Sequence, residues 1–196
     1  MGFKRLVLAP ALLLGAVSAH AQGAAPAPTP LAPLSPPPAT NTTLATPAPH
    51  YVSIVLTADI NRPAAQAWQR IGKYCDIGEW LQMSCRLTAG DDWSVGSVRL
   101  LRESVVEVLV GRTPLSYTYT QPVRAGAPYN LYHGTLALEP VSAKRSKLVY
   151  TLFFDNSFVE GDVARESDQE TRRTRFGQAV AIMKILAEGG KAPPAK

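Results

Sequence analysis

Residues 97–121, with the sequence SVRLLRESVVEVLVGRTPLSYTYTQ, decide the fold of this chain. Apolar and aromatic side chains recur two positions apart along the stretch, and this period is typical of strands because successive side chains point to opposite faces. Thr113-Pro114 is typical of a turn, and a connection this short joins two antiparallel neighbouring strands. The predicted strands run over Ser97 to Arg102, Val105 to Gly111 and Ser116 to Gln121.

The same pattern continues on both sides of this stretch. Further strands are predicted over Tyr51 to Asp59, Ser84 to Thr88, Tyr132 to Pro140 and Lys147 to Asp155, with turns at 89–92, 125–128 and 142–146. After the first strand, Asn61-Arg62-Pro63 is typical of a helix start, with Asn61 as the expected cap. This first helix has an apolar face, and a second short helix or turn follows over Asp76 to Leu81. The residues of that face are Ala64, Ala67, Trp68 and Ile71.

The last predicted element is a long amphipathic helix from Asp162 to Ala187. Its first turns are acidic, which suits the helix dipole, and an apolar stripe follows in its second half. The order of elements is strand, two helices, about six strands and one helix. It predicts an α+β domain in which a curved antiparallel sheet of about seven strands wraps around the C-terminal helix. Such a sheet and a helix cannot interdigitate along their whole length, so we expect a cavity.

The first 50 residues predict export. Residues 1–21 combine Lys4 and Arg5 with the apolar run Leu6 to Val17 and a small-x-small cleavage site, which is typical of a signal peptide cut near Ala21/Gln22. The run is too short to span a bilayer, and no later stretch is longer; an uncut N-terminal anchor is the alternative. Residues 22–50 then form a Pro/Ala/Thr-rich linker, which we expect to be disordered. We expect the domain over 51–188, a disordered tail over 189–196 and a periplasmic or secreted location.

The net charge and the two cysteines argue against nucleic-acid binding and against a metal or redox site. The net charge is +5, and two positive residues leave with the signal peptide, so a basic-patch argument for nucleic acid has little support. Cys75 and Cys85 are predicted to form a disulfide because an exported protein reaches an oxidising compartment. A redox or metal pair is the alternative, but further ligands are not nearby, and we expect no metal or other cofactor.

Several segments, in this order, resemble the SRPBCC superfamily, which includes polyketide cyclase/dehydrase-like and START-like proteins. They are Ile71 to Tyr74 with Trp80, Val95 to Leu100, Val106 to Leu109, Ser116 to Tyr119 and Tyr132 to Leu136. The resemblance implies a helix-grip fold with a pocket for hydrophobic or amphipathic small molecules between the sheet and the last helix. Most members bind a ligand and only some catalyse. The signal peptide, linker and cysteine pair depart from the cytosolic members, so a cytosolic partner does not carry over.

Carried over by position, the resemblance implies a set of pocket-facing residues. They are Met83, Arg99, Leu101, Glu107, Tyr117, Tyr119, Tyr132, Tyr150, Leu152, Phe176, Val180 and Met183. Strand alternation supports the grouping, because members of each strand pair lie two positions apart. The tyrosines would give apolar walls with polar tips, or else serve ordinary sheet packing.

Arg99 and Glu107 are the charged residues that we expect to face inward on neighbouring strands. They could orient a polar group of the ligand, or they could form a structural ion pair between the strands. His133 should point away from the pocket if Tyr132 points in, and no Ser/His/Asp triad can be assembled. Arg172, Arg173 and Arg175 predict a solvated face of the last helix rather than a nucleic-acid or lipid-headgroup site.

These observations leave three functional hypotheses. The first is an exported pocket protein, which we expect to be a monomer, that binds or carries a small hydrophobic ligand such as a lipid, sterol, aromatic or polyketide-like molecule. The second is a cyclase, dehydratase or isomerase with Glu107 as acid/base and Arg99 or a tyrosine stabilising an enolate; a nearby Arg99 would favour the charged carboxylate and so oppose it. The third is an accessory factor for another exported protein.

Overall fold

The structure is a computed structural model that describes residues 48–122 and 129–194. The predicted signal peptide, most of the predicted linker, the predicted turn at 125–128 and residues 195–196 lie outside the described residues. The elements follow the predicted order. They are β1 (Tyr51–Ile60), α1 (Ala64–Ile71), α2 (Ile77–Trp80), β2 (Cys85–Ala89), β3 (Val98–Leu101), β4 (Val105–Thr113), β5 (Ser116–Thr120), β6 (Asn130–Ser142), β7 (Arg145–Asp155) and α3 (Asp162–Ala187).

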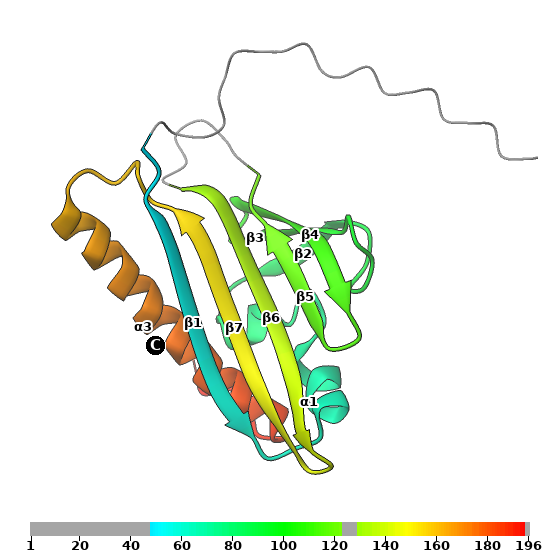
Figure 1. Cartoon of the computed structure of the whole chain (residues 1–196). Coiled ribbons are helices and arrows are strands. Elements are labelled where there is room, and N and C mark those ends of the chain that lie inside the picture. Colours follow the sequence, from blue (N-terminus) through cyan, green and yellow to red (C-terminus); the bar gives the residue numbers. More distant parts are fainter. Residues whose placement is uncertain (1–47, 123–128, 195–196) are drawn as a thin grey trace, which may run out of the picture. The chain divides into compact units, whose positions relative to one another are not determined.

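The strands form one antiparallel sheet in the order β1-β7-β6-β5-β4-β3-β2 (Figure 1). Strands β2 to β7 pair with their sequence neighbours, as short connections require, and the chain's first strand pairs with its last. The β1/β7 register runs from Tyr51 opposite Asp155 to Ile60 opposite Ser146. The predicted seven-stranded curved sheet with a long C-terminal helix is therefore confirmed.

The start of α1 differs from the prediction. The residue before the helix is Pro63, and it makes no side-chain capping bond. The predicted cap Asn61 lies further out, where its backbone N–H donates to Glu188 Oε1 at 2.8 Å. The cap prediction was wrong because Pro63, whose fixed φ already suits a helix entrance, lets the helix begin without a side-chain acceptor. The predicted apolar face of α1 is buried.

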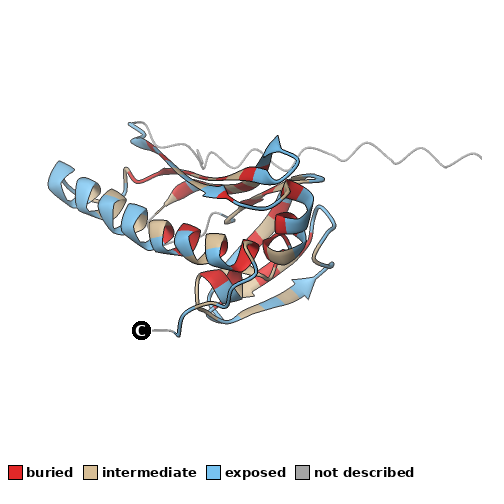
Figure 2. Ribbon diagram, turned by 90° about the horizontal axis from the view of Figure 1, so that it is seen from below, coloured by how far each residue is buried: buried red, intermediate tan, exposed pale blue. Residues whose placement is uncertain are grey.

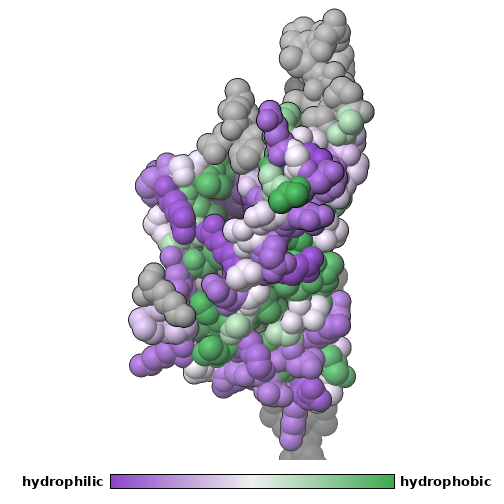
Figure 3. Space-filling view, turned by 90° about the vertical axis from the view of Figure 1, so that its left-hand side faces the viewer, coloured by the Kyte–Doolittle hydropathy of each residue, from purple (hydrophilic) through white to green (hydrophobic). Residues whose placement is uncertain are grey.

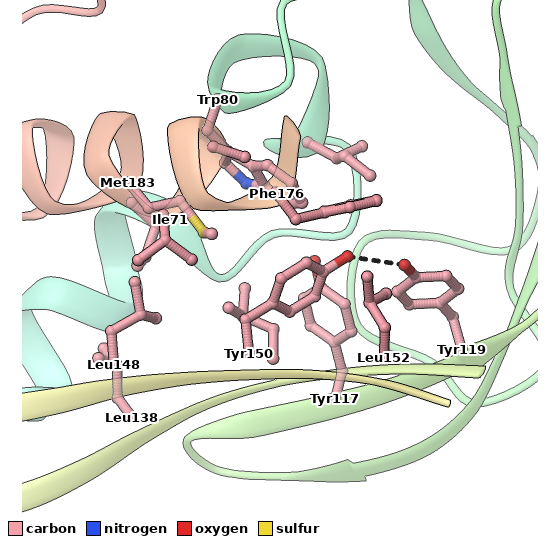
Figure 4. Close-up of a cluster of buried hydrophobic side chains, with 14 of the residues drawn as sticks. Ile71, Trp80, Tyr117, Tyr119, Leu138, Leu148, Tyr150, Leu152, Phe176 and Met183 are labelled. Carbon is pink, nitrogen blue, oxygen red and sulfur yellow. Dashed lines mark hydrogen bonds between the residues drawn. The ribbon is translucent and has the colours of Figure 1, made fainter. Parts of the chain in front are cut away.

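The long helix α3 has the predicted bounds but packs along only part of its length. Its buried residues all lie in the second half, whereas the first turns are mostly exposed (Figure 2). Met183 and Phe176 of α3 meet Trp80 of α2 above the side chains of β6 and β7 (Figure 4). The second half of α3 therefore holds the helix on the sheet, and the first half extends beyond the packed core.

Two local features shape the inner face of the sheet. The Tyr119 hydroxyl is hydrogen-bonded to the Tyr150 hydroxyl at 2.7 Å (Figure 4). The Tyr119 ring lies against Gly134, the residue opposite it on β6, where an added Cβ would come within 2.3 Å of the phenol. Tyr119 can occupy this place only because residue 134 has no side chain.

The predicted disulfide is present between Cys75 and Cys85, with the two Cα atoms 5.7 Å apart. It connects the segment between α1 and α2 to the first residue of β2. The segment that carries Tyr74 and Asp76 is therefore covalently attached to the sheet edge. After α3, the tail contacts the domain at Pro193, whose carbonyl accepts a hydrogen bond from Gln82 Nε2 at 2.6 Å.

Candidate ligand-binding cavity

A cavity of about 590 Å³ lies between α2, the inner face of the β3–β5 strands and α3. Its volume is within the range of small-molecule sites. The lining residues are Ile77, Leu81, Met83, Leu101, Arg102, Ser104, Val105, Val106, Glu107, Tyr119, Gln121, Pro122, Tyr129, Tyr132, Arg172, Arg175 and Phe176. Most of these side chains are aliphatic or aromatic, so the walls can accept an apolar molecule.

The aromatic side of the cavity is a packed group of rings. The ring of Tyr132 lies 6.5 Å from that of Tyr119, 5.8 Å from that of Tyr129 and 5.7 Å from that of Phe154, centre to centre. Burial raises the pKa values of the Tyr119 and Tyr132 hydroxyls above the ordinary tyrosine value. These phenols are therefore neutral at neutral pH, and they offer hydrogen bonds without adding charge.

The twelve residues that the resemblance points to fall into two groups. Met83, Leu101, Glu107, Tyr119, Tyr132 and Phe176 line the cavity, and whether they bind a ligand stays a prediction. Arg99, Tyr117, Tyr150, Leu152, Val180 and Met183 are not among the lining residues and are buried in the packed core. Within the second group, Tyr150 and Leu152 lie beneath α3 (Figure 4). Arg99 and Tyr117 are covered instead by Tyr74 from the α1–α2 segment, whose ring centre lies 4.1 Å from the guanidinium and 5.6 Å from the Tyr117 ring.

Arg99 is buried in an ion pair. Its Nε donates to Glu107 Oε2 at 2.8 Å, its Nη2 lies 2.6 Å from the same oxygen, and its Nη1 donates to the Tyr74 carbonyl. Burial lowers the pKa of Arg99, but the Glu107 carboxylate and nearby tyrosines outweigh this effect and leave the pKa raised. The guanidinium also lies 4.1 Å from the centre of the Tyr74 ring. Of the two roles open for Arg99, the geometry favours the structural ion pair.

Glu107 differs from Arg99 because it reaches the cavity. It is the only carboxylate among the described residues that line it. Its second oxygen, Oε1, accepts a hydrogen bond from Gln121 Nε2 at 3.0 Å. Both oxygens are therefore engaged by protein donors, which holds the carboxylate in one orientation at the cavity wall.

The arginine run on α3 was only partly assigned correctly. Arg173 is exposed, as predicted, but Arg172 and Arg175 line the cavity. Arg172 lies 3.7 Å from the centre of the Tyr129 ring, and its Nε is 3.3 Å from Asp168 Oδ2. Burial, with a smaller effect from Arg175, lowers the pKa of Arg172 to about 10. The prediction failed because the cavity leaves this part of α3 unpacked, so polar residues reach the inner side.

Sequence reasoning missed other lining residues as well. Arg172 lies four positions before Phe176 and three before Arg175, and these spacings place side chains next to each other on a helix surface and could have indicated both arginines. No comparable signal exists for the residues in turns and at strand ends. The missed residues are Ile77, Leu81, Arg102, Ser104, Val105, Val106, Gln121, Pro122, Tyr129, Arg172 and Arg175.

Other kinds of site find little support in the described parts of the chain. His133 is not among the cavity residues, and its ring Nδ1 lies 2.7 Å from the Leu131 carbonyl oxygen. Over residues 48–122 and 129–194, no group of His, Cys, Asp and Glu could hold a metal ion. No helix in these ranges is long and apolar enough to cross a membrane. The side of the domain on which α3 lies shows hydrophobic side chains in small patches between hydrophilic ones (Figure 3).

Comparison with solved structures shows the same fold in other proteins. A protein from Thermobifida fusca is 23% identical, with a TM-score of 0.56, over 70% of this chain and 96% of that chain. An aromatase/cyclase from Streptomyces sp. R1128 is 16% identical, with a TM-score of 0.53, over 72% and 99%. Norcoclaurine synthase from Thalictrum flavum, solved with dopamine and hydroxybenzaldehyde, is 11% identical, with a TM-score of 0.53, over 73% and 90%.

The family comparison is more specific than the structural one. No curated protein matches the chain. A family model described as polyketide cyclase / dehydrase and lipid transport matches residues 51–180, from the first strand to the buried half of α3. The matched residues include all strands of the sheet and all but one, Met183, of the twelve residues in the two groups described above. The chain therefore belongs to the polyketide cyclase/dehydrase and lipid transport family.

Proposed function

We propose that this protein is an exported binding protein that carries a small hydrophobic or amphipathic molecule in the cavity under α3. The observation that carries the proposal is a cavity of about 590 Å³ with aromatic and aliphatic walls. Burial of apolar ligand surface would drive binding at roughly 25 cal/mol per Å². The family description includes lipid transport, and the norcoclaurine synthase structure holds two small aromatic molecules in the same fold.

Export is part of the proposal. It is supported by the basic, apolar and small-residue pattern of residues 1–21 and by the Cys75–Cys85 disulfide, which suits an oxidising compartment. The uncharged linker would separate the domain from whatever precedes it. In an aqueous envelope space, a molecule of low solubility needs such a carrier.

The test of binding uses N-phenyl-1-naphthylamine, a neutral aromatic probe that fluoresces in apolar surroundings. Val105→Trp would fill the cavity, because Val105 lines it, whereas Val110→Trp on the same strand is exposed and does not line it. We expect the probe to bind the wild type and Val110→Trp equally, and Val105→Trp at least about tenfold more weakly, because the indole occupies ligand volume. Equal binding by both variants, or no binding by the wild type, would contradict the proposal.

A catalytic role is the second candidate, because Glu107 places one carboxylate at the cavity wall. In that role Glu107 would exchange a proton with a bound substrate, as in a cyclase, dehydratase or isomerase. Arg99 and Gln121 already engage both oxygens of this carboxylate, so neither oxygen is free to meet a substrate, and this favours binding over catalysis. Glu107→Gln keeps the acceptor for Gln121 but removes the acid/base group, and because it also removes the counter-charge of buried Arg99, thermal unfolding first checks that the variant is folded. Loss of turnover on a cavity-sized substrate with unchanged probe binding would support the enzyme, and unchanged turnover would exclude this role for Glu107.

A further inference from the structure

We propose that the cavity selects amphipathic anions, and that Arg102 and Arg175 bind the acidic end of the ligand. The inference rests on the proposed binding function and names its ligand class: an apolar body with a carboxylate, phosphate or sulfonate at one end. Arg99, the residue that the sequence suggested as a selector, is already neutralised by Glu107. Selection by charge therefore has to come from other residues.

Cations reach the cavity from two separate elements. Arg102 belongs to the turn between β3 and β4, and Arg172 and Arg175 belong to the middle of α3. The one carboxylate that lines the cavity, Glu107, is paired with Arg99. The cavity therefore combines an apolar, aromatic wall with the guanidinium groups of three arginines, and Glu107 neutralises none of them.

Arg102 and Arg175 form no side-chain ion pair within the described residues. The acidic residues nearest to them in sequence are engaged elsewhere. Glu103 pairs with Arg86 at 3.1 Å, Glu170 approaches Arg173 at 3.8 Å, and Asp168 approaches Arg172 at 3.3 Å. Because guanidinium groups form strong paired hydrogen bonds with carboxylates and phosphates, these two arginines are suited to an anion from outside the chain.

The electrostatics of the cluster agree with this reading. Burial lowers the pKa of Arg175, and the positive charge of Arg102 lowers it further. Arg102 and Arg175 line the same cavity from different elements, and their like charges repel each other there. A bound anion would relieve this repulsion, which adds to its affinity.

Arg102 is held at the cavity by an unusual backbone. Arg102 and Glu103 both have left-handed φ values, 49° and 55°, which residues other than glycine seldom adopt. In this turn Arg102 lines the cavity while Glu103 pairs with Arg86. A turn built with glycine would cost less energy, but it would not supply the cation.

Arg172 has a supporting role. Its contacts with Asp168 and with the Tyr129 ring leave its side chain 15% exposed. It adds positive potential to the cavity while fixing Tyr129 as a wall. The variants that test charge selection therefore leave Arg172 in place.

The test compares two probes with the same anilinonaphthalene body. N-phenyl-1-naphthylamine is neutral, and 1-anilinonaphthalene-8-sulfonate carries one negative charge. We expect the wild type to bind the sulfonate about tenfold more tightly at low salt, since charge-assisted hydrogen bonds to two guanidinium groups are added. Arg102→Gln/Arg175→Gln should lose this preference and keep its affinity for the neutral probe. The matched control Arg173→Gln, an exposed neighbour on α3, should keep both affinities.

The outcomes separate this inference from the proposed function. Binding of the neutral probe without a preference for the sulfonate would overturn the inference alone, as would a preference that survives in the double variant. Failure of both probes to bind would overturn the binding function as well. Thermal unfolding checks that the double variant is folded, and the single variants Arg102→Gln and Arg175→Gln, each expected to lose part of the preference, stand in if it is not.

Competition experiments distinguish the sources of the acidic group. Dodecanoate, dodecyl phosphate and dodecanol share one apolar chain and differ in their end groups. We expect both anions to displace the neutral probe at lower concentration than dodecanol. A stronger effect of the phosphate would indicate a lipid headgroup, and a stronger effect of the carboxylate would indicate a fatty or aromatic acid. Equal displacement by all three compounds would overturn the inference.

Discussion

Arg99 and Arg102 stand three residues apart in the β3–β4 hairpin, yet the structure gives them opposite surroundings. Arg99 is fully buried, pairs with Glu107 and donates to the Tyr74 carbonyl. Arg102 is exposed at the cavity, and its side chain forms no ion pair with a described residue. The difference shows that two arginines of one hairpin can have different roles when only one of them has a counter-charge within reach.

The largest expected effect comes from breaking the buried site. Arg99→Met leaves Glu107 buried with Gln121 as its remaining side-chain partner, so we expect about 3 to 5 kcal/mol of lost stability. Chemical denaturation measures this loss. In Arg99→Met/Glu107→Gln the unpaired charge is gone, and we expect the double variant to recover a large part of the stability. A single variant as stable as the wild type would show that Arg99 is not a structural residue.

The next effect tests how the segment next to Arg99 is held. Tyr74, whose carbonyl accepts a hydrogen bond from Arg99, directly precedes Cys75. Cys75→Ser opens the disulfide, and for a loop of this length we expect about 2 to 3 kcal/mol of lost stability. Reducing agent should lower the Tm of the wild type and leave Cys75→Ser/Cys85→Ser unchanged. A wild-type Tm that does not respond to reduction would show that the disulfide does not stabilise the fold.

A smaller effect in the same segment depends on pH. Burial raises the pKa of Asp76 to about 6, against 3.8 for an ordinary aspartate. The folded protein then binds the proton more tightly than the unfolded chain, so this carboxylate lowers stability as pH rises from about 4 to above 6. We expect Asp76→Asn to match the wild type near pH 4 and to exceed it by roughly 1 kcal/mol at pH 8, because solvent screens a partly exposed carboxylate. Denaturation at both pH values checks this, and a variant less stable than the wild type at pH 8 would contradict it.

The smallest effect on stability is expected at the cavity arginines. Arg175→Gln removes an exposed charge that no described carboxylate pairs with, so its stability should stay within about 0.5 kcal/mol of the wild type. Chemical denaturation of Arg175→Gln and Arg99→Met under the same conditions compares the two free energies of unfolding directly. A loss of stability comparable to that of Arg99→Met would mean that Arg175 is structural as well.

The fold was predictable because its signals are local. Strand alternation and short turns gave the strands of the sheet to within a few residues, and the predicted bounds of α3 are those observed. The apolar face of α1 follows from its helical spacing. Asn61 was misassigned as the cap because an asparagine shortly before a helix looks the same in sequence whether or not its side chain caps the helix.

The candidate site was predictable only in part. Helical spacing puts Phe176, Val180 and Met183 on one face of α3, but it does not say how closely the helix approaches the sheet along its length. Phe176 therefore reaches the cavity while Val180 and Met183 are enclosed in the core. Strand alternation placed Arg99 and Glu107 inward on neighbouring strands and left two roles open for them, and the position of Arg102 at the cavity depends on a left-handed turn that no spacing encodes.

Gly134 affects the volume of the cavity although it does not line it. The Tyr119 ring fits against this glycine, and a single added methyl group would force the ring away from β6. Because the other side of Tyr119 is cavity wall, the displaced phenol would take up space otherwise available to the ligand. The absence of a side chain at position 134 thus helps to set the volume of the cavity.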